Sequence, residues 1–148
     1  MKIAVDAQTL ATPEGGIRHY LESTLQSMHS LLPEAEFHLW FYGAIPESAR
    51  ILPSRVHYRS LGLPSWFRFR GVLAPLLLSY ASWRADVYWG PCCVLPWFCA
   101  APLRFVTFYD ASVWNSKRWW SWTNLVLPMH TRRSAAQATA IWIISSLL

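Results

Sequence analysis

Short apolar runs alternate along the chain with longer stretches of helical periodicity. Residues 2–6 form an apolar run that ends in an acid, and polar, glycine-rich residues follow it to Gly16. Between Gly16 and Pro33, apolar side chains recur every three or four positions with polar side chains mostly between them. These patterns predict a buried parallel strand, a loop and an amphipathic helix.

Further strands and helices are expected in the rest of the chain. Strands are predicted at residues 36–42, 55–59, 86–89, 103–109 and 141–144, and helices at residues 67–82, with a kink at Pro75, and in a segment ending near Thr139. Alternating strands and helices favour right-handed crossovers. We therefore expect one α/β domain over residues 1–148, with a Rossmann-like, mostly parallel sheet and helices on both faces.

The carboxyl ends of the predicted strands are the expected place for a site. In open α/β sheets, ligands bind outside these ends. The loops after Asp6, Trp89 and Tyr109 should therefore share one rim.

Composition and charge narrow the range of partners. Hydrophobic residues make up 53% of the 148 residues and charged residues 14%, which excludes disorder and favours an aromatic core or a lipid-facing surface. The formal net charge of +5 favours phosphorylated ligands or an anionic membrane face. The basic residues are scattered and no nucleic-acid motif occurs, so no nucleic-acid partner is expected.

Cysteine spacing and the amino terminus point to the cytoplasm. Cys92, Cys93 and Cys99 match neither a disulfide framework nor a zinc ligand set, so no metal is expected. The first six residues do not resemble a signal peptide. The apolar run at residues 71–81 is shorter than the ~20 residues of a spanning helix.

Two segments combine aromatic and basic residues. The first contains Trp66, Phe67 and Phe69 with Arg68 and Arg70, and the second contains Trp119, Trp120 and Trp122 beside Lys117 and Arg118. Such mixtures are typical of peripheral contact with an anionic membrane, here the inner face of the cell membrane. Core packing or an interdomain face explains the aromatic residues equally well.

Four stretches, in this order, carry a resemblance to a known family. They are residues 1–7 with Gly15–Arg18, residues 86–91 with Leu95 and Pro96, residues 106–110, and residues 132–135 leading to Ala140, Ile141 and Ser145. On this pattern the chain resembles the N-terminal domain of the family-4 glycosyltransferases, bacterial enzymes that build lipopolysaccharide and exopolysaccharide. The likeness spans nearly the whole chain.

The resemblance implies a retaining GT-B hexosyltransferase that uses neither a metal nor another cofactor. In that family the N-terminal domain holds the acceptor, a glycan or lipid-linked sugar, and the C-terminal domain holds the nucleotide sugar. The acidic pair that grips the donor belongs to the second domain. Because the sequence ends where the interdomain connection should begin, we expect a truncated chain that transfers no hexose alone, either a remnant or a partner of a separately encoded donor domain.

By this resemblance, Tyr109 and Asp110 are candidate catalytic residues, and the candidate substrate-binding residues are Gly15, Gly16 and Arg18. Gly15 and Gly16 would let backbone N–H groups approach a phosphate or sugar hydroxyl, although two glycines can also simply turn the chain. Arg18 would neutralise a phosphate or lie on a solvated helix face. Tyr109 and Asp110 stand where the family usually has His-Asp, and tyrosine, with a pKa near 10, is a poor substitute for imidazole. Asp110 would orient an acceptor hydroxyl or cap its loop.

Two other functions compete with a glycosyltransferase domain. One is a non-catalytic acceptor-binding or membrane-associated module. The other is a free-standing nucleotide-binding, flavodoxin-like protein, which ranks last because the glycine fingerprint and ribose-binding acid are not convincingly present.

Overall fold

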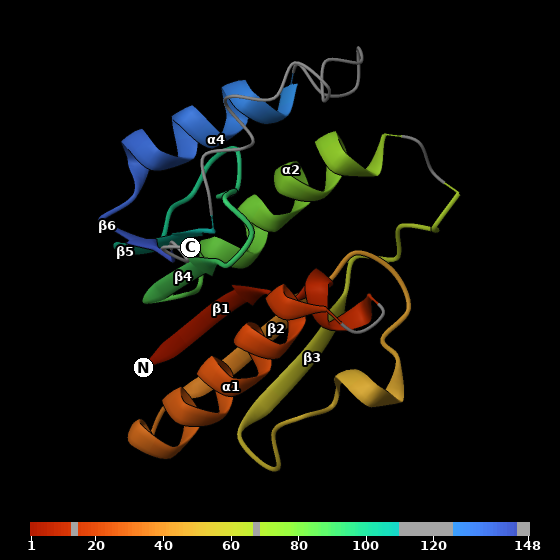
Figure 1. Ribbon diagram of the computed structural model, residues 1–148, viewed down its shortest axis with the longest axis vertical. Coiled ribbons are helices and arrows are strands. Elements are labelled where there is room, and N and C mark those ends of the chain that lie inside the picture. Colours follow the sequence, from red (N-terminus) through yellow and green to blue (C-terminus); the bar gives the residue numbers. More distant parts are fainter. Residues whose placement is uncertain (13–14, 67–68, 110–125, 145–148) are drawn as a thin grey trace.

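Six parallel strands form one open sheet in the computed structural model, which describes residues 1–12, 15–66, 69–109 and 126–144 (Figure 1). The strands are β1 (Lys2–Asp6), β2 (Glu36–Phe41), β3 (Val56–Ser60), β4 (Val87–Gly90), β5 (Leu103–Phe108) and β6 (Ala140–Ile143). Their order across the sheet is β3-β2-β1-β4-β5-β6, and every neighbouring pair is parallel. The predicted Rossmann-like α/β class is confirmed.

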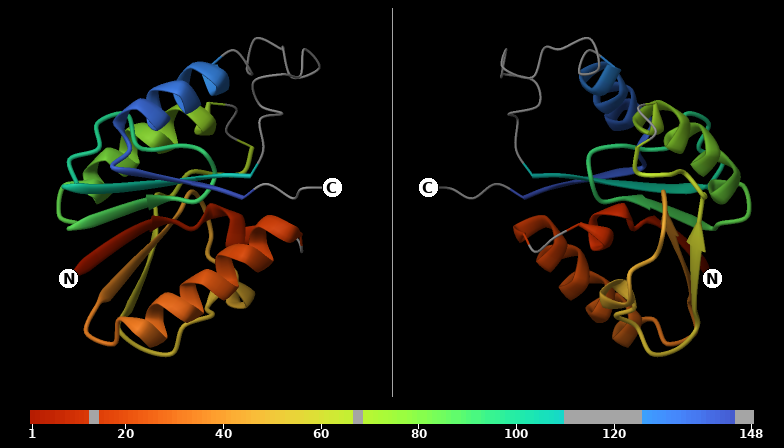
Figure 2. Two further views of the ribbon diagram at one scale, coloured as in Figure 1. Left: turned by 60° about the vertical axis from the view of Figure 1, so that its left-hand side comes forward. Right: turned by 90° about the vertical axis from the view of Figure 1, so that its right-hand side faces the viewer.

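Helices cover both faces of this sheet. Helix α1 (Gly16–Leu31) lies on one face, and α2 (Arg70–Ser82) and α4 (Val126–Gln137) lie on the other (Figure 2). Short 3-10 helices, η1 (Gln8–Ala11) and η2 (Glu47–Ala49), follow β1 and β2. Helix α2 contains Pro75 as expected but begins at Arg70, later than predicted from the sequence.

Alternating side chains of the strands divide the core into two clusters. On the α1 side, Ile3 and Val5 of β1 are buried in one cluster with Leu21 and Leu25 of the helix. On the α2 side, Ala4 belongs to a second cluster around the fully buried ring of Tyr88, from β4. The central strands are thus buried on both faces, as expected for parallel strands.

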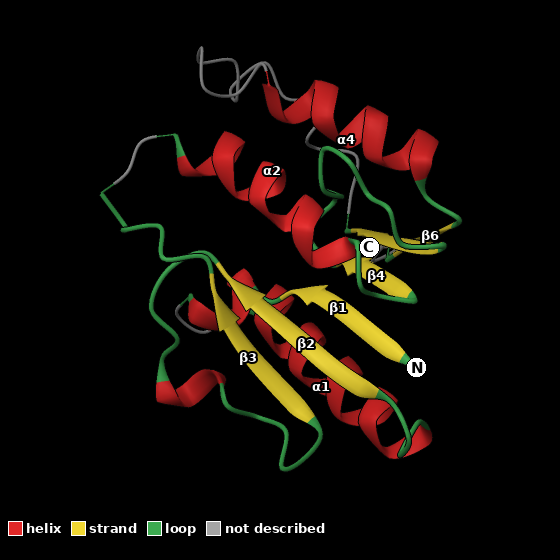
Figure 3. Ribbon diagram, turned by 180° about the vertical axis from the view of Figure 1, so that it is seen from behind, coloured by secondary structure: helices red, strands yellow, loops and turns green. Residues whose placement is uncertain are grey.

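Each face of the sheet has a part that no described helix covers. On the α1 side an apolar hollow of about 370 Å³ opens over β4 and β5, with Trp89, Phe105 and Trp142 among its walls. On the α2 side the strands β1, β2 and β3 face the viewer without a helix in front of them in Figure 3. These open faces arise because the helices cover diagonally opposite halves of the sheet.

Close backbone packing at the end of β4 yields a stability prediction. A Cβ atom on Gly90 would overlap the carbonyl oxygen of Val94, so the loop leaves no room for a side chain. Gly90→Ala should lower the free energy of unfolding by about 2 kcal/mol or more. Urea unfolding followed by circular dichroism measures the change. Gly16→Ala is the control because a Cβ there meets no heavy atom within 4 Å; equal stability of the two variants would contradict this account.

Candidate functional site

The loops that follow β1, β4 and β5 meet at one edge of the sheet, as predicted. The Thr9 hydroxyl and Cys92 thiol, from the loops after β1 and β4, are 2.8 Å apart and share a hydrogen bond. The amide of Cys93 donates to the carbonyl of Thr107 in β5 at 3.0 Å. The chain runs from β1 outward to β2 but from β4 outward to β5 on the other side. The rim between β1 and β4 is therefore the topological switch point, where ligands of such sheets bind.

Asp6 is the buried acid of this rim. Only 7% of the residue is exposed, and its carboxylate accepts hydrogen bonds from the Tyr42 hydroxyl at 2.8 Å and the Gln8 amide at 3.1 Å. Burial raises the pKa of Asp6 from 3.8 to about 6, against the lowering effect of these two bonds. The carboxyl group therefore gains and loses its proton in mildly acidic solution.

Sequence reasoning did not include Asp6 among the site residues. The available signal was an acid at the end of a buried strand. Its main partner, Tyr42, lies 36 positions away along the chain. The backbone N–H of Tyr42 also donates a hydrogen bond to the side-chain oxygen of Gln8, at 2.7 Å.

Tyr109 lies at the end of β5 on the same rim. Its ring packs edge to face against Tyr20 of α1, with the ring centres 5.7 Å apart. The Tyr109 hydroxyl is buried, without a hydrogen-bond partner among the described residues. Burial raises the pKa of Tyr109 above its ordinary value of 10.0, and Cys92 adds to the effect. Tyr109 can therefore donate a hydrogen bond at neutral pH but does not act as a base. Asp110, its predicted companion, lies outside the described residues.

Gly15 and Gly16 form the start of α1. No side chain caps this helix, and its first turn contains no acid. An open hollow of about 320 Å³ lies against the two glycines and the side chains of Arg18, His19 and Glu22. Gly15 has an extended backbone that any residue adopts, and a Cβ on either glycine would meet no atom within 4 Å. Neither backbone strain nor internal packing requires these glycines, and their small size leaves the helix amides accessible.

Arg18 lines this hollow but is engaged inside the protein. Its Nε donates to a carboxylate oxygen of Glu22 at 2.8 Å. Its two terminal nitrogens donate to the carbonyl oxygens of Thr12 and Ser48, at 2.9 and 3.0 Å. Arg18 therefore holds α1 to two loops, and any ligand phosphate has to share the remaining N–H donors of a fixed guanidinium.

The two cysteines at the rim are suited to packing. Burial raises the pKa of the Cys92 thiol to about 12, although its bond to Thr9 acts in the opposite direction. A thiol that remains protonated at neutral pH is a poor nucleophile. Cys93 is itself buried within the second core cluster.

The first aromatic and basic segment is strongly exposed where it is described. Trp66 and Phe69 are 78% and 70% exposed. Phe67 and Arg68 lie outside the described residues, as does the second segment with Trp119, Trp120, Trp122, Lys117 and Arg118. In the described part of the chain, no helix has the length and hydropathy needed to cross a bilayer.

No protein-family model, curated protein or solved structure matches the chain. The glycosyltransferase resemblance thus stays a prediction from the four sequence stretches.

The raised pKa of Asp6 predicts a pH-dependent stability. The folded protein keeps this proton up to about pH 6, whereas the unfolded chain loses it near pH 3.8, so Asp6 makes folding less favourable as the pH rises between these values. Asp6→Asn removes the effect, so its free energy of unfolding should rise by about 2 kcal/mol relative to that of wild type between pH 4 and pH 7. Chemical unfolding across that range measures the difference. For Glu47→Gln, at an exposed carboxylate, the free energy of unfolding should depend on pH as it does in wild type. The same pH dependence in Asp6→Asn would contradict the burial of this charge.

Proposed function

We propose that this chain is the acceptor-side domain of a retaining GT-B glycosyltransferase. The full enzyme would transfer a hexose from a nucleotide sugar to a glycan or lipid-linked sugar in cell-surface polysaccharide synthesis. The observation that carries the proposal is that helix α1, which begins in the resembling stretch Gly15–Arg18, contacts Tyr109 of another such stretch through Tyr20. The rim that contains Tyr109 adjoins the switch point of a 3-2-1-4-5-6 sheet.

The amino end of α1 supports a role in holding the acceptor. Its first N–H groups have no partners within the helix, and no side chain caps them. The helix dipole adds a partial positive charge at this end. A sugar hydroxyl or a diphosphate of a lipid-linked sugar satisfies such donors, and Gly16 lets it come close.

Asp6 and Tyr109 supply complementary hydrogen-bonding groups at the same rim. The Asp6 carboxyl accepts hydrogen bonds when ionised, and the Tyr109 hydroxyl has donor capacity that the described residues leave unused. Together they suit the orientation of sugar hydroxyls. The nucleotide sugar would bind a second domain, so the chain alone should transfer no hexose from UDP- or GDP-linked donors.

Calorimetric titration of the chain tests the acceptor role. The probes are N-acetylglucosamine linked to farnesyl diphosphate, a short mimic of a lipid-linked acceptor, and UDP-glucose and GDP-mannose as donors. Saturable binding of the acceptor mimic, with donors at least about ten-fold weaker, is expected. Donor binding as tight as that of the mimic, or no binding of the mimic, would contradict the proposal.

Gly16→Val localises this binding. Its side chain enters open space, so the fold should be kept, but it covers the approach to the helix amides. Affinity for the acceptor mimic should fall at least about ten-fold. Ser30→Val, near the other end of α1, is the matched control and should bind as wild type does. Equal affinity of the two variants would argue against the helix end as the binding element.

A membrane-associated module is the second candidate, favoured by an exposed apolar surface around α2. It contains Trp66, Phe69, Val72, Leu76, Trp83 and Phe98, each at least 45% exposed. A hollow of about 440 Å³ between α2 and the loop with Trp97 and Phe98 has apolar walls only. Four of these residues, Phe69, Val72, Leu76 and Phe98, line this hollow, and contiguous exposed apolar surface marks an interaction site. Aromatic side chains here suit the headgroup level of a bilayer.

Vesicle sedimentation tests this surface. The chain should co-sediment with vesicles containing phosphatidylglycerol, and Trp66→Ser combined with Phe69→Ser should reduce the bound fraction at least about five-fold. Leu31→Ser, at an equally exposed apolar residue at the end of α1, should bind as wild type does. Loss of binding in both the double variant and Leu31→Ser would indicate nonspecific apolar adsorption instead of a defined membrane surface.

A further inference from the structure

A basic hollow lies away from the rim, beside the end of α2. It opens on the face of β1, β2 and β3 that is turned to the viewer in Figure 3. Its volume is about 300 Å³. The side chains around it that can interact with a polar ligand are Lys2, His38, Trp40, Arg59, Tyr80 and Arg84. The small side chain of Ala4, which pairs with His38 across the strands, forms part of the floor.

The three cations of this hollow lack acidic partners. Lys2, Arg59 and Arg84 make no ion pair within the described part of the chain, whereas Arg18, Arg50 and Arg55 each pair with a glutamate there. No acid lines the hollow. Cations held around one cavity raise the local potential and draw in an anion.

One buried nitrogen atom in the hollow also lacks a partner. Trp40 Nε1 has no hydrogen-bond partner among the described residues, whereas His38 Nε2 makes no hydrogen bond there but is 3.8 Å from a carboxylate oxygen of Glu36. Leaving a buried donor unpaired costs about 1–3 kcal/mol. The indole nitrogen of Trp40 is only a donor, so the missing partner is an acceptor. Both the unpaired cations and the unpaired N–H donor therefore favour a ligand that is negatively charged and accepts hydrogen bonds.

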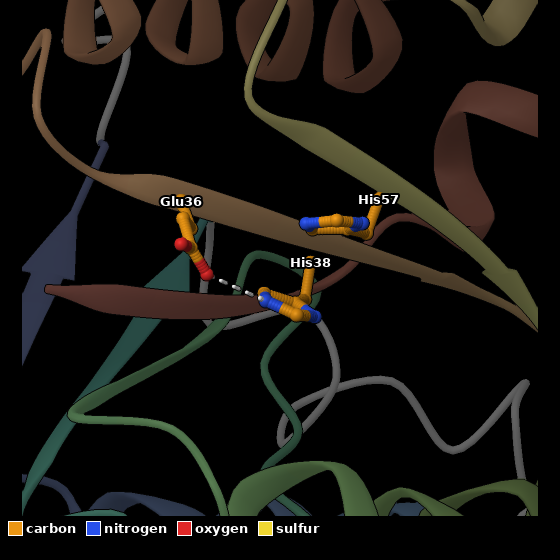
Figure 4. Close-up of side chains that lie close together, drawn as sticks. All are labelled: Glu36, His38 and His57. Carbon is orange, nitrogen blue, oxygen red and sulfur yellow. Dashed lines mark ion pairs between the residues drawn. The ribbon is translucent and has the colours of Figure 1, made fainter.

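A metal ion is the competing occupant, because three possible ligands lie together at this face. Glu36, His38 and His57 offer ligand atoms within 4.8 Å of one another, and His38 Nε2 is 3.8 Å from a Glu36 oxygen (Figure 4). The two imidazole rings project from directly paired positions of β2 and β3. However, this cluster has one acid, while the hollow that His38 lines has three cations. The surrounding charge opposes a divalent cation and favours an anion.

We propose that this basic hollow binds a small oxyanion of the phosphate class, held by Arg59 and Arg84 and by the Trp40 N–H. Its volume lies at the lower end of the range for small-molecule sites, roughly 300–1,000 Å³. The hollow therefore fits phosphate or a phosphorylated sugar better than a nucleotide sugar. Trp40 and Tyr80 provide aromatic surface beside the charges. The site is separate from the acceptor rim, and its residues are not those on which the proposed function depends.

Calorimetric titration at low ionic strength tests the site, with inorganic phosphate, glucose 6-phosphate and phosphatidylglycerol vesicles as separate probes. Saturable binding of at least one probe is expected, at least about five-fold weaker in Arg59→Gln and in Arg84→Gln. Arg50→Gln, at an exposed arginine paired with Glu47, is the control and should bind as wild type does. Tighter binding of glucose 6-phosphate than of phosphate would identify a phosphorylated sugar, and preference for vesicles a lipid headgroup.

The Trp40 indole gives a second, local readout. Its N–H signal, assigned by its loss in Trp40→Phe, should shift on saturation with the bound probe in the nitrogen–proton NMR spectrum, as expected when it donates to the anion. Three results would overturn the proposal: no saturable binding of any probe, equal weakening in Arg50→Gln, or an unmoved Trp40 signal at saturation. Tight Zn²⁺ binding that is lost in Glu36→Gln and His57→Ala, without phosphate binding, would assign the hollow to a metal instead.

Discussion

Parallel pairing on both sides of β1 is the constraint on which the rest of this structure depends. Val5 is in register with Leu39 of β2 on one side and with Trp89 of β4 on the other. The sheet therefore grows from β1 through β2 to β3 on one side and from β4 through β5 to β6 on the other. Right-handed crossovers then set α1 against one face and α2 and α4 against the other. Because all six strands are parallel, the loops after β1, β4 and β5 meet at one edge.

The same constraint divides the uncovered surface into two chemically different hollows. Side chains of successive residues point to opposite faces of a strand. Lys2 therefore lines the basic hollow, while its neighbour Ile3 lines the apolar one. The basic hollow contains cations and the unpaired N–H of Trp40, whereas the other hollow presents Trp89 and Trp142. The rim at the carboxyl ends of the strands, the basic hollow and the apolar surface of α2 are thus separate consequences of one sheet with incomplete cover.

Periodicity along the chain predicted the strands and helices well, because burial on one or both faces of a sheet imposes a local pattern. The predicted strands at residues 36–42 and 103–109 are observed as Glu36–Phe41 and Leu103–Phe108. The common rim of three loops followed from parallel topology. The contacts that give side chains their chemistry did not, because they join positions far apart: Tyr42 reaches Asp6, and Arg18 reaches Ser48. The basic hollow likewise needs the register that pairs His38 with His57.

The most direct test of this account is a crystal structure of the chain with N-acetylglucosamine linked to farnesyl diphosphate. We predict that the sugar and diphosphate lie at the carboxyl ends of β1 and β4, with the diphosphate at the amino end of α1 near Gly16. Tyr109 should lie beside the sugar. A ligand bound at the opposite edge of the sheet, or only on the apolar surface of α2, would contradict the account.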